Sequence, residues 1–119
     1  MNNLVFLDLS ENIVSENIDL DFTHKHKLTV LKILTSNDVV LNSIAKMPNL
    51  RSLDIESYSN NALNIIGRMT NLENLSIRCR VDISYLKPNQ ERQKLESISN
   101  LKNLKKLSIN FCKNGTWFF

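Results

Sequence analysis

The chain repeats one arrangement of apolar positions five times. Each copy has an aliphatic residue, two variable residues, a second aliphatic residue, one variable residue and a third aliphatic residue. The first leucines of the copies lie 24, 22, 22 and 32 residues apart. A period of this length is typical of a solenoid in which each repeat contacts only its neighbours. The copies are Leu4-Leu7-Leu9, Leu28-Leu31-Ile33, Leu50-Leu53-Ile55, Leu72-Leu75-Ile77 and Leu104-Leu107-Ile109.

The spacing inside each copy predicts a β-strand. Its last two aliphatic residues lie two positions apart, so both point to one face of a strand and the residue between them points to the other. We expect the five strands to stack as a parallel sheet, because the rest of each period is long enough for the crossover that parallel neighbours need.

The connections between the strands differ. Two of them predict short helices, because their apolar residues recur every three positions and share one helical face. These residues are Leu41, Ile44 and Met47, and Leu63, Ile66 and Met69. The first connection alternates at Ile18, Leu20 and Phe22, which predicts extended chain. The fourth has Leu95, Ile98 and Leu101 in helical spacing after an insertion near 85–94.

The repeated phrase resembles the leucine-rich repeat family. The family pattern, with its asparagine or cysteine at the end, is complete in Leu4-Leu7-Leu9-Asn12 and, with isoleucine third, in Leu104-Leu107-Ile109-Cys112. It departs at Ser36, Tyr58 and Arg80. The resemblance implies an α/β solenoid with five short parallel strands on a concave face and short helices or extended crossovers on the convex face. It implies protein recognition and no reaction.

We expect one domain over residues 1–119, with repeats that start near 3, 27, 49, 71 and 103. On the concave face, outward side chains should form three rows, two, four and six positions after each first leucine. The first row is Phe6, Val30, Ser52, Asn74 and Lys106. The second row is Asp8, Lys32, Asp54, Ser76 and Ser108. The third row is Ser10, Leu34, Glu56, Arg78 and Asn110.

Part of this face is expected to bind protein. Phe6, Val30 and Leu34 form an apolar cluster on adjacent strands, and exposed apolar clusters with an aromatic residue often mark contact surfaces. The alternative is that the N-terminal tail or a second copy of the chain covers the cluster. The expected protein-binding residues are Phe6, Asp8, Val30, Lys32, Leu34, Asp54, Glu56 and Arg78.

The two ends of the stack differ in charge. Residues 1–24 contain five acidic residues and no lysine or arginine, whereas residues 86–119 contain seven basic and two acidic residues. Little chain precedes the first strand, so its edge is expected to be uncapped, and homo-oligomerisation through this edge is one hypothesis.

At the C-terminal end, we expect an aromatic plug. Trp117 follows its leucine at the same distance as Leu41 and Leu63 follow theirs, so it can take the inward helical position. Phe111, Phe118 and Phe119 would close the core edge with it.

Composition fits one ordinary soluble domain of 119 residues, with a net charge of +3. No apolar stretch approaches the roughly 18 to 20 residues of a membrane span. Two cysteines, Cys79 and Cys112, make no disulfide framework and are interpreted as structural thiols. These features favour a cytoplasmic protein, in the host cell if it is a secreted effector.

No enzymatic chemistry, cofactor or metal site is predicted. The chain has only two glycines, no phosphate-binding loop and no zinc-ligand spacing. His24 and His26 lie beside lysines, which oppose cation binding. The chain is therefore expected not to be an enzyme.

The leading hypothesis is a protein–protein interaction module that uses the concave sheet face. Two alternatives stay open: the substrate-recognition part of a larger ubiquitin ligase or secreted bacterial effector, and a self-associating structural unit. The insertion is polar from Lys87 to Lys94, where four of eight residues are charged, but this stretch lacks the interleaved aromatic residues that favour nucleic-acid binding. Neither a nucleic acid nor a membrane is the expected partner.

Overall fold

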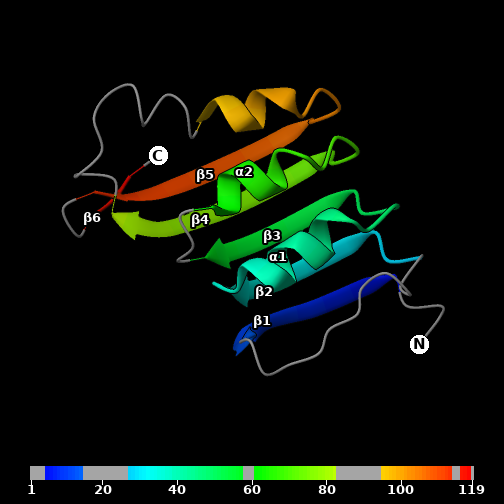
Figure 1. The fold of residues 1–119 in the computed structure, drawn as a ribbon, viewed down its shortest axis with the longest axis horizontal. Helices are drawn as coiled ribbons and strands as arrows, with labels where there is room; N and C mark the ends of the chain where they lie inside the picture. Colours follow the sequence, from blue (N-terminus) through cyan, green and yellow to red (C-terminus); the bar gives the residue numbers. More distant parts are fainter. Residues whose placement is uncertain (1–4, 15–26, 58–60, 83–94, 114–115, 119) are drawn as a thin grey trace.

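The protein forms a sheet with short helices on one of its faces. The computed structural model describes residues 5–14, 27–57, 61–82, 95–113 and 116–118. In this part of the chain, strands lie side by side in sequence order, and the first five run parallel (Figure 1). The strands are β1 (Phe6–Val14), β2 (Val30–Thr35), β3 (Ser52–Ser57), β4 (Asn74–Asp82), β5 (Lys106–Lys113) and β6 (Thr116–Phe118). The predicted α/β class and five-stranded parallel sheet are confirmed.

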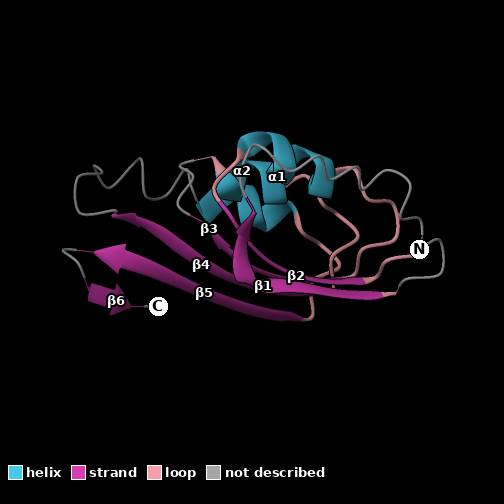
Figure 2. Ribbon diagram, turned by 90° about the horizontal axis from the view of Figure 1, so that it is seen from below, coloured by secondary structure: helices cyan, strands magenta, loops and turns pink. Residues whose placement is uncertain are grey.

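Helical segments connect the middle strands. Helix α1 (Asp38–Ala45) follows β2, helix α2 (Ala62–Ile66) follows β3, and the 3₁₀ segment η3 (Ser97–Asn100) precedes β5. Figure 2 shows α1 and α2 on the same side of the sheet. Helix α1 begins after Asn37, whose Oδ1 accepts a hydrogen bond from the Val39 N–H at 2.8 Å. Such N-caps satisfy backbone donors that have no partner inside a helix.

The core lies between the sheet and these helices. Burial alternates along β2 and β3, as a period of two requires. The inward leucines Leu31, Leu53 and Leu75 face one another in register and are at most 2% exposed. All six apolar residues predicted for the two helical crossovers are buried, including Met47 and Met69 beyond the helix ends. The predicted core of the middle repeats is confirmed.

A repeated backbone contact ties each repeat to the next. The carbonyl just before each strand accepts hydrogen bonds from two successive N–H groups of the following repeat. The Arg51 carbonyl, for example, accepts from Glu73 at 2.8 Å and from Asn74 at 3.0 Å. The carbonyls of Val5, Thr29 and Glu73 make the equivalent pair of bonds. The sheet is therefore joined by one motif that recurs along the stack.

Close packing also joins α2 to η3. Gly67 ends α2, and a Cβ atom at this position would overlap the carbonyl oxygen of Ser97. The Ser97 hydroxyl lies 2.6 Å from Oδ1 of Asn64. Glycine is therefore required here by the close approach of the two segments.

Leu95 is not a core residue, contrary to the prediction for the fourth connection. It is 45% exposed, whereas Ile98 and Leu101 of the same spacing are buried. The described helical layer ends here: α2 lies on one side of residues 95–100, and no described helix lies on the other.

Trp117 lies in a strand and not at a helical position, whereas the predicted aromatic plug concerns side chains of residues 111 and 117–119 that lie outside the described parts. Residues 116–118 form β6, which pairs antiparallel with β5 and sets Trp117 opposite Cys112. The sheet therefore has a sixth, antiparallel strand that was not expected. The sequence carries a signal for it, because Asn114-Gly115 is the dipeptide most favoured between two hairpin strands.

Several predictions concern residues outside the described parts. They are the extended connection at Ile18, Leu20 and Phe22, the His24–His26 pair and the 85–94 insertion. The side chains of Cys79 and Cys112 are likewise outside them, although both residues lie in strands. Among the helices of the described residues, none is both long and apolar enough to cross a lipid bilayer.

Candidate functional site

The sheet face opposite α1 and α2 (Figure 2) is here called the open face. The residues of the predicted rows lie along it in the register of the strands. Residues of the first row stand opposite one another from Phe6 on β1 to Lys106 on β5. The second row is likewise in register from Asp8 to Ser108. Both rows were predicted correctly, because the strand spacing within every repeat is the same.

The third row departs from prediction at its first member. Leu34, Glu56, Arg78 and Asn110 are in register on β2 to β5. On β1, however, Ile13 stands opposite Leu34, because the register shifts after Leu9. The position predicted for Ser10 is therefore wrong. Such bulges break a strict period of two and are not visible in the repeated phrase.

The apolar cluster of Phe6, Val30 and Leu34 lies at the β1–β2 end of the open face. Phe6 is 50% exposed and stands opposite Val30, while Val30 and Leu34 are half-buried. The Lys32 ammonium lies 5.9 Å from the centre of the Phe6 ring. A cation–π contact of this kind stabilises by about 0.5–1 kcal/mol at an exposed site. Lys32 therefore covers only part of the aromatic surface.

A trough of about 300 Å³ runs across β2 to β5 between the first two rows. Its floor is backbone, because Leu31, Leu53 and Leu75 point into the core. The rows are two residues apart along each strand, and the trough crosses three strand spacings, so it is about 7 Å wide and about 14 Å long. The outward residues along it are Val30, Lys32, Ser52, Asp54, Asn74, Ser76, Lys106 and Ser108.

The trough exists because its rims carry small side chains. Ser52, Ser76 and Ser108 leave space that longer residues would fill, and Asn74 Nδ2 donates a hydrogen bond to the Ser52 Oγ at 3.0 Å. Lys106 closes the β5 end. Hydroxyl, amide, ammonium and carboxylate groups thus surround a floor whose own backbone groups are engaged in the sheet. This arrangement can bind a polar ligand through its rims.

The predicted binding residues divide into two groups. Val30, Lys32 and Asp54 line the trough, whereas the other five lie on the open face outside it. Those five are Phe6, Asp8, Leu34, Glu56 and Arg78. The serines of the rims, Asn74 and Lys106 were assigned to rows but not to the site. A partial signal for them was present in the sequence, because Ser76 and Ser108 are small residues at equivalent positions of consecutive repeats.

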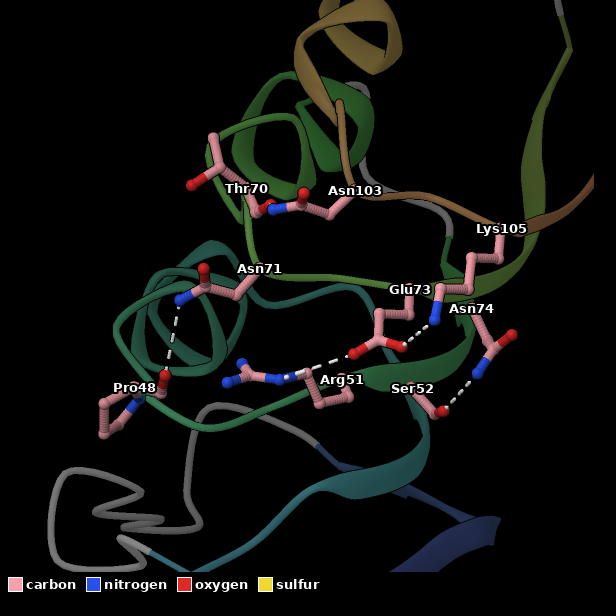
Figure 3. Close-up of polar contacts among 9 residues, drawn as sticks. All are labelled: Pro48, Arg51, Ser52, Thr70, Asn71, Glu73, Asn74, Asn103 and Lys105. Atoms are coloured by element: carbon pink, nitrogen blue, oxygen red, sulfur yellow. Dashed lines mark hydrogen bonds and ion pairs between the residues drawn. The ribbon is translucent and has the colours of Figure 1, made fainter.

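A second polar region lies where the chain enters β3, β4 and β5 (Figure 3). The Glu73 carboxylate stands between two cations, at 3.6 Å from Arg51 Nε and 3.1 Å from Lys105 Nζ. With Asn71 and Asn103, these residues line a space of about 260 Å³. All three charged side chains are at least one-third exposed, so each ion pair contributes only about 0.2–1 kcal/mol.

The asparagines of this region link consecutive repeats. Asn71 Nδ2 donates to the Pro48 carbonyl at 3.4 Å, and Asn103 Nδ2 donates to the Thr70 carbonyl at 2.9 Å (Figure 3). Both asparagines directly precede the first leucine of their phrase, and both acceptors lie at the equivalent place one repeat earlier. The two asparagines therefore have a structural role.

Comparison with protein-family models, curated proteins and solved structures finds no match. Within the described part of the chain, no three His, Cys, Asp or Glu side chains are grouped so that they could hold a metal ion. Function must therefore be inferred from the open face.

Proposed function

We propose that the chain is a leucine-rich-repeat solenoid that acts as a protein-interaction module through its open face. The constant phrase, the parallel strands in chain order and the recurrent carbonyl contact support the repeat architecture. Ser36, Tyr58 and Arg80 depart from the family pattern, in which an asparagine or cysteine binds backbone. Here Asn71 and Asn103 supply side-chain bonds to the backbone between consecutive repeats.

One observation carries the proposed activity: an exposed aromatic residue lies beside a trough with polar rims, on a sheet face that no described helix covers. Phe6 offers an apolar anchor, and aromatic anchors dominate many protein interfaces. The adjacent hydroxyl, amide and charged groups can satisfy the polar groups of a partner, as interface rims do. A shallow surface that spans several strands suits a protein better than a small molecule, which needs a deeper pocket.

Charge also favours a protein partner over a nucleic acid. Among the residues whose side chains the structure describes, the open face holds three acidic residues, Asp8, Asp54 and Glu56, against the basic Lys32, Arg78 and Lys106. Nucleic-acid affinity depends on an excess of cations that neutralise phosphates. A balanced surface of this kind lacks that excess.

The test compares two variants for binding to a partner. Affinity capture from the source cells identifies a candidate, and calorimetry with the purified candidate measures the dissociation constant. Replacing Phe6, Val30 and Leu34 together with alanine should weaken binding at least about tenfold, because it removes the anchor. The control is Val39→Ala, which removes an apolar side chain that is 74% exposed on α1, on the other face.

Circular dichroism verifies that both variants are folded. Unchanged affinity of the triple variant, or equal weakening by Val39→Ala, would exclude the open face as the binding surface. In that case the helical face becomes the region to map.

A further inference from the structure

We propose that copies of this chain associate head to tail, with β1 of one copy adding to the free edge of β5 in the next. The proposal is independent of the open-face function. It rests on the backbone edges of β1 and β5 that no described strand pairs with, on the exposed Leu107, and on the opposite charge of the two ends.

The β5 edge is only partly occupied. Strand β6 pairs with Phe111–Lys113, so the preceding Lys106–Asn110 have no described strand on that side. The inward Leu107 is 50% exposed, although the equivalent Leu75 is 2% exposed. The Lys105 carbonyl accepts no bond from a described residue, whereas its equivalents in the four preceding repeats each accept two. One strand is thus missing from the repeated pattern.

Strand β1 has the features of the missing strand. It is the other edge of the sheet among the described strands (Figure 1), and its regular register covers Phe6–Leu9 before the shift. Val5 and Phe6 are each 50% exposed. An unpaired strand edge is a template for pairing with another chain. Its regular part therefore matches the length of the free β5 edge.

Continuing the observed register across the two copies makes specific pairs. Phe6 would stand opposite Lys106 and Leu7 opposite Leu107, which would cover the exposed leucine. The Lys105 carbonyl would receive the N–H groups of Val5 and Phe6, the bonds that this position makes in every earlier repeat. Within one copy, Lys32 already lies over the ring of Phe6. The contact between copies would thus repeat the kinds of interaction that the fold already makes between its own repeats.

Charge selects a second copy as the occupant. Residues 1–24 carry five acidic side chains and no lysine or arginine, and residues 86–119 carry seven basic side chains against two acidic ones. On the described surface, Asp8 is exposed at one end and Lys102, Lys105 and Lys106 are exposed at the other. Opposite charges favour head-to-tail contact and oppose head-to-head contact. Because this contact is heterologous, it can join more than two copies, either into open chains or into closed rings.

Analytical ultracentrifugation of the full chain tests the proposal over a range of concentrations. The average mass should rise with concentration beyond a dimer, and the rise should weaken as salt is added. Val5→Lys with Asp8→Lys makes the β1 end basic, and Lys106→Glu with Ser108→Glu makes the β5 end acidic. Each pair of substitutions alone should weaken association at least about tenfold, because like charges then meet.

Mixing these two double variants should restore association, because opposite charges meet again. A chain that carries all four substitutions should also associate. The control is Val39→Glu with Lys46→Glu on the helical side, which changes the net charge as much as the β5 variant does and should leave association unchanged. A wild-type chain that stays monomeric at its solubility limit overturns the proposal. So does a mixture that associates no better than either variant alone.

Discussion

The middle strands and the last parallel strand carry the same phrase but bury it differently. Leu53 and Leu75 are at most 2% exposed, whereas Leu107 at the equivalent position of β5 is 50% exposed. Among the described residues, Leu53 and Leu75 have a repeat on each side, whereas β5 has a full repeat on one side only. Burial in this protein is therefore a property of the neighbours of a repeat as much as of its own residues.

The largest expected effect comes from truncating the leucine at these equivalent positions of a middle strand and of β5. Leu53→Ala should lower the free energy of unfolding by about 2–5 kcal/mol, because it leaves a cavity in a closed core. Leu107→Ala should cost only about 1 kcal/mol, because half of that side chain already contacts water. Urea unfolding followed by circular dichroism at low protein concentration measures both. Equal losses would show that the end of the core is closed in solution.

A second substitution tests how closely the last helical segment, η3, packs against α2. Gly67→Ala should cost about 1–3 kcal/mol, because the new methyl group overlaps the Ser97 carbonyl. The backbone of Gly67 is ordinary, with φ of −60°, so helix propensity alone would favour alanine. A loss of stability would therefore show that the contact between Gly67 and Ser97 outweighs helix propensity, whereas a gain would show the reverse. Arg68→Ala, at the exposed next position, serves as the control and should change stability by less than about 0.5 kcal/mol.

The smallest expected effect comes from removing the side-chain hydrogen bonds that Asn71 and Asn103 make between repeats. Asn103→Ala should cost about 0.5–1.5 kcal/mol, because it removes a well-formed hydrogen bond between the last two repeats. Asn71→Ala should cost less, since its bond is 3.4 Å long against 2.9 Å for Asn103. Thermal unfolding of both variants beside Asn100→Ala, an exposed control, measures the difference. A larger loss for Asn71 would contradict the order given by the two distances.

Much of the fold was predictable because it follows a local period. The phrase around Leu53 and Ile55 gives the strand, and its constant spacing gives the register of the first two rows. The helical spacing of Leu41 and Ile44 gives the buried face of α1. These features depend on residues within one repeat, so one repeat is enough to predict them.

The errors lie where the period stops or meets a competing signal. Counting positions from Leu104 predicted that Trp117 takes the place of an inward helical residue. Asn114-Gly115 instead favours a hairpin, and β6 pairs with β5. The predicted place of Ser10 failed because β1 shifts register after Leu9. Leu95 has the right spacing, but no described helix lies on its outer side.

The candidate site likewise has features that follow from the local period and features that depend on neighbouring segments. Its rows could be read from the sequence, but the trough depends on four strands lying side by side, three of which contribute a small residue: Ser52, Ser76 and Ser108. The repeated phrase alone determined which residues form strands, which face each side chain takes and which rows align. Only the tertiary structure decided which of them are covered, because exposure, the trough and the free edge of β5 depend on the adjacent segments. The spacing of residues along a strand sets which face each side chain takes, whereas burial requires an adjacent segment that covers the side chain.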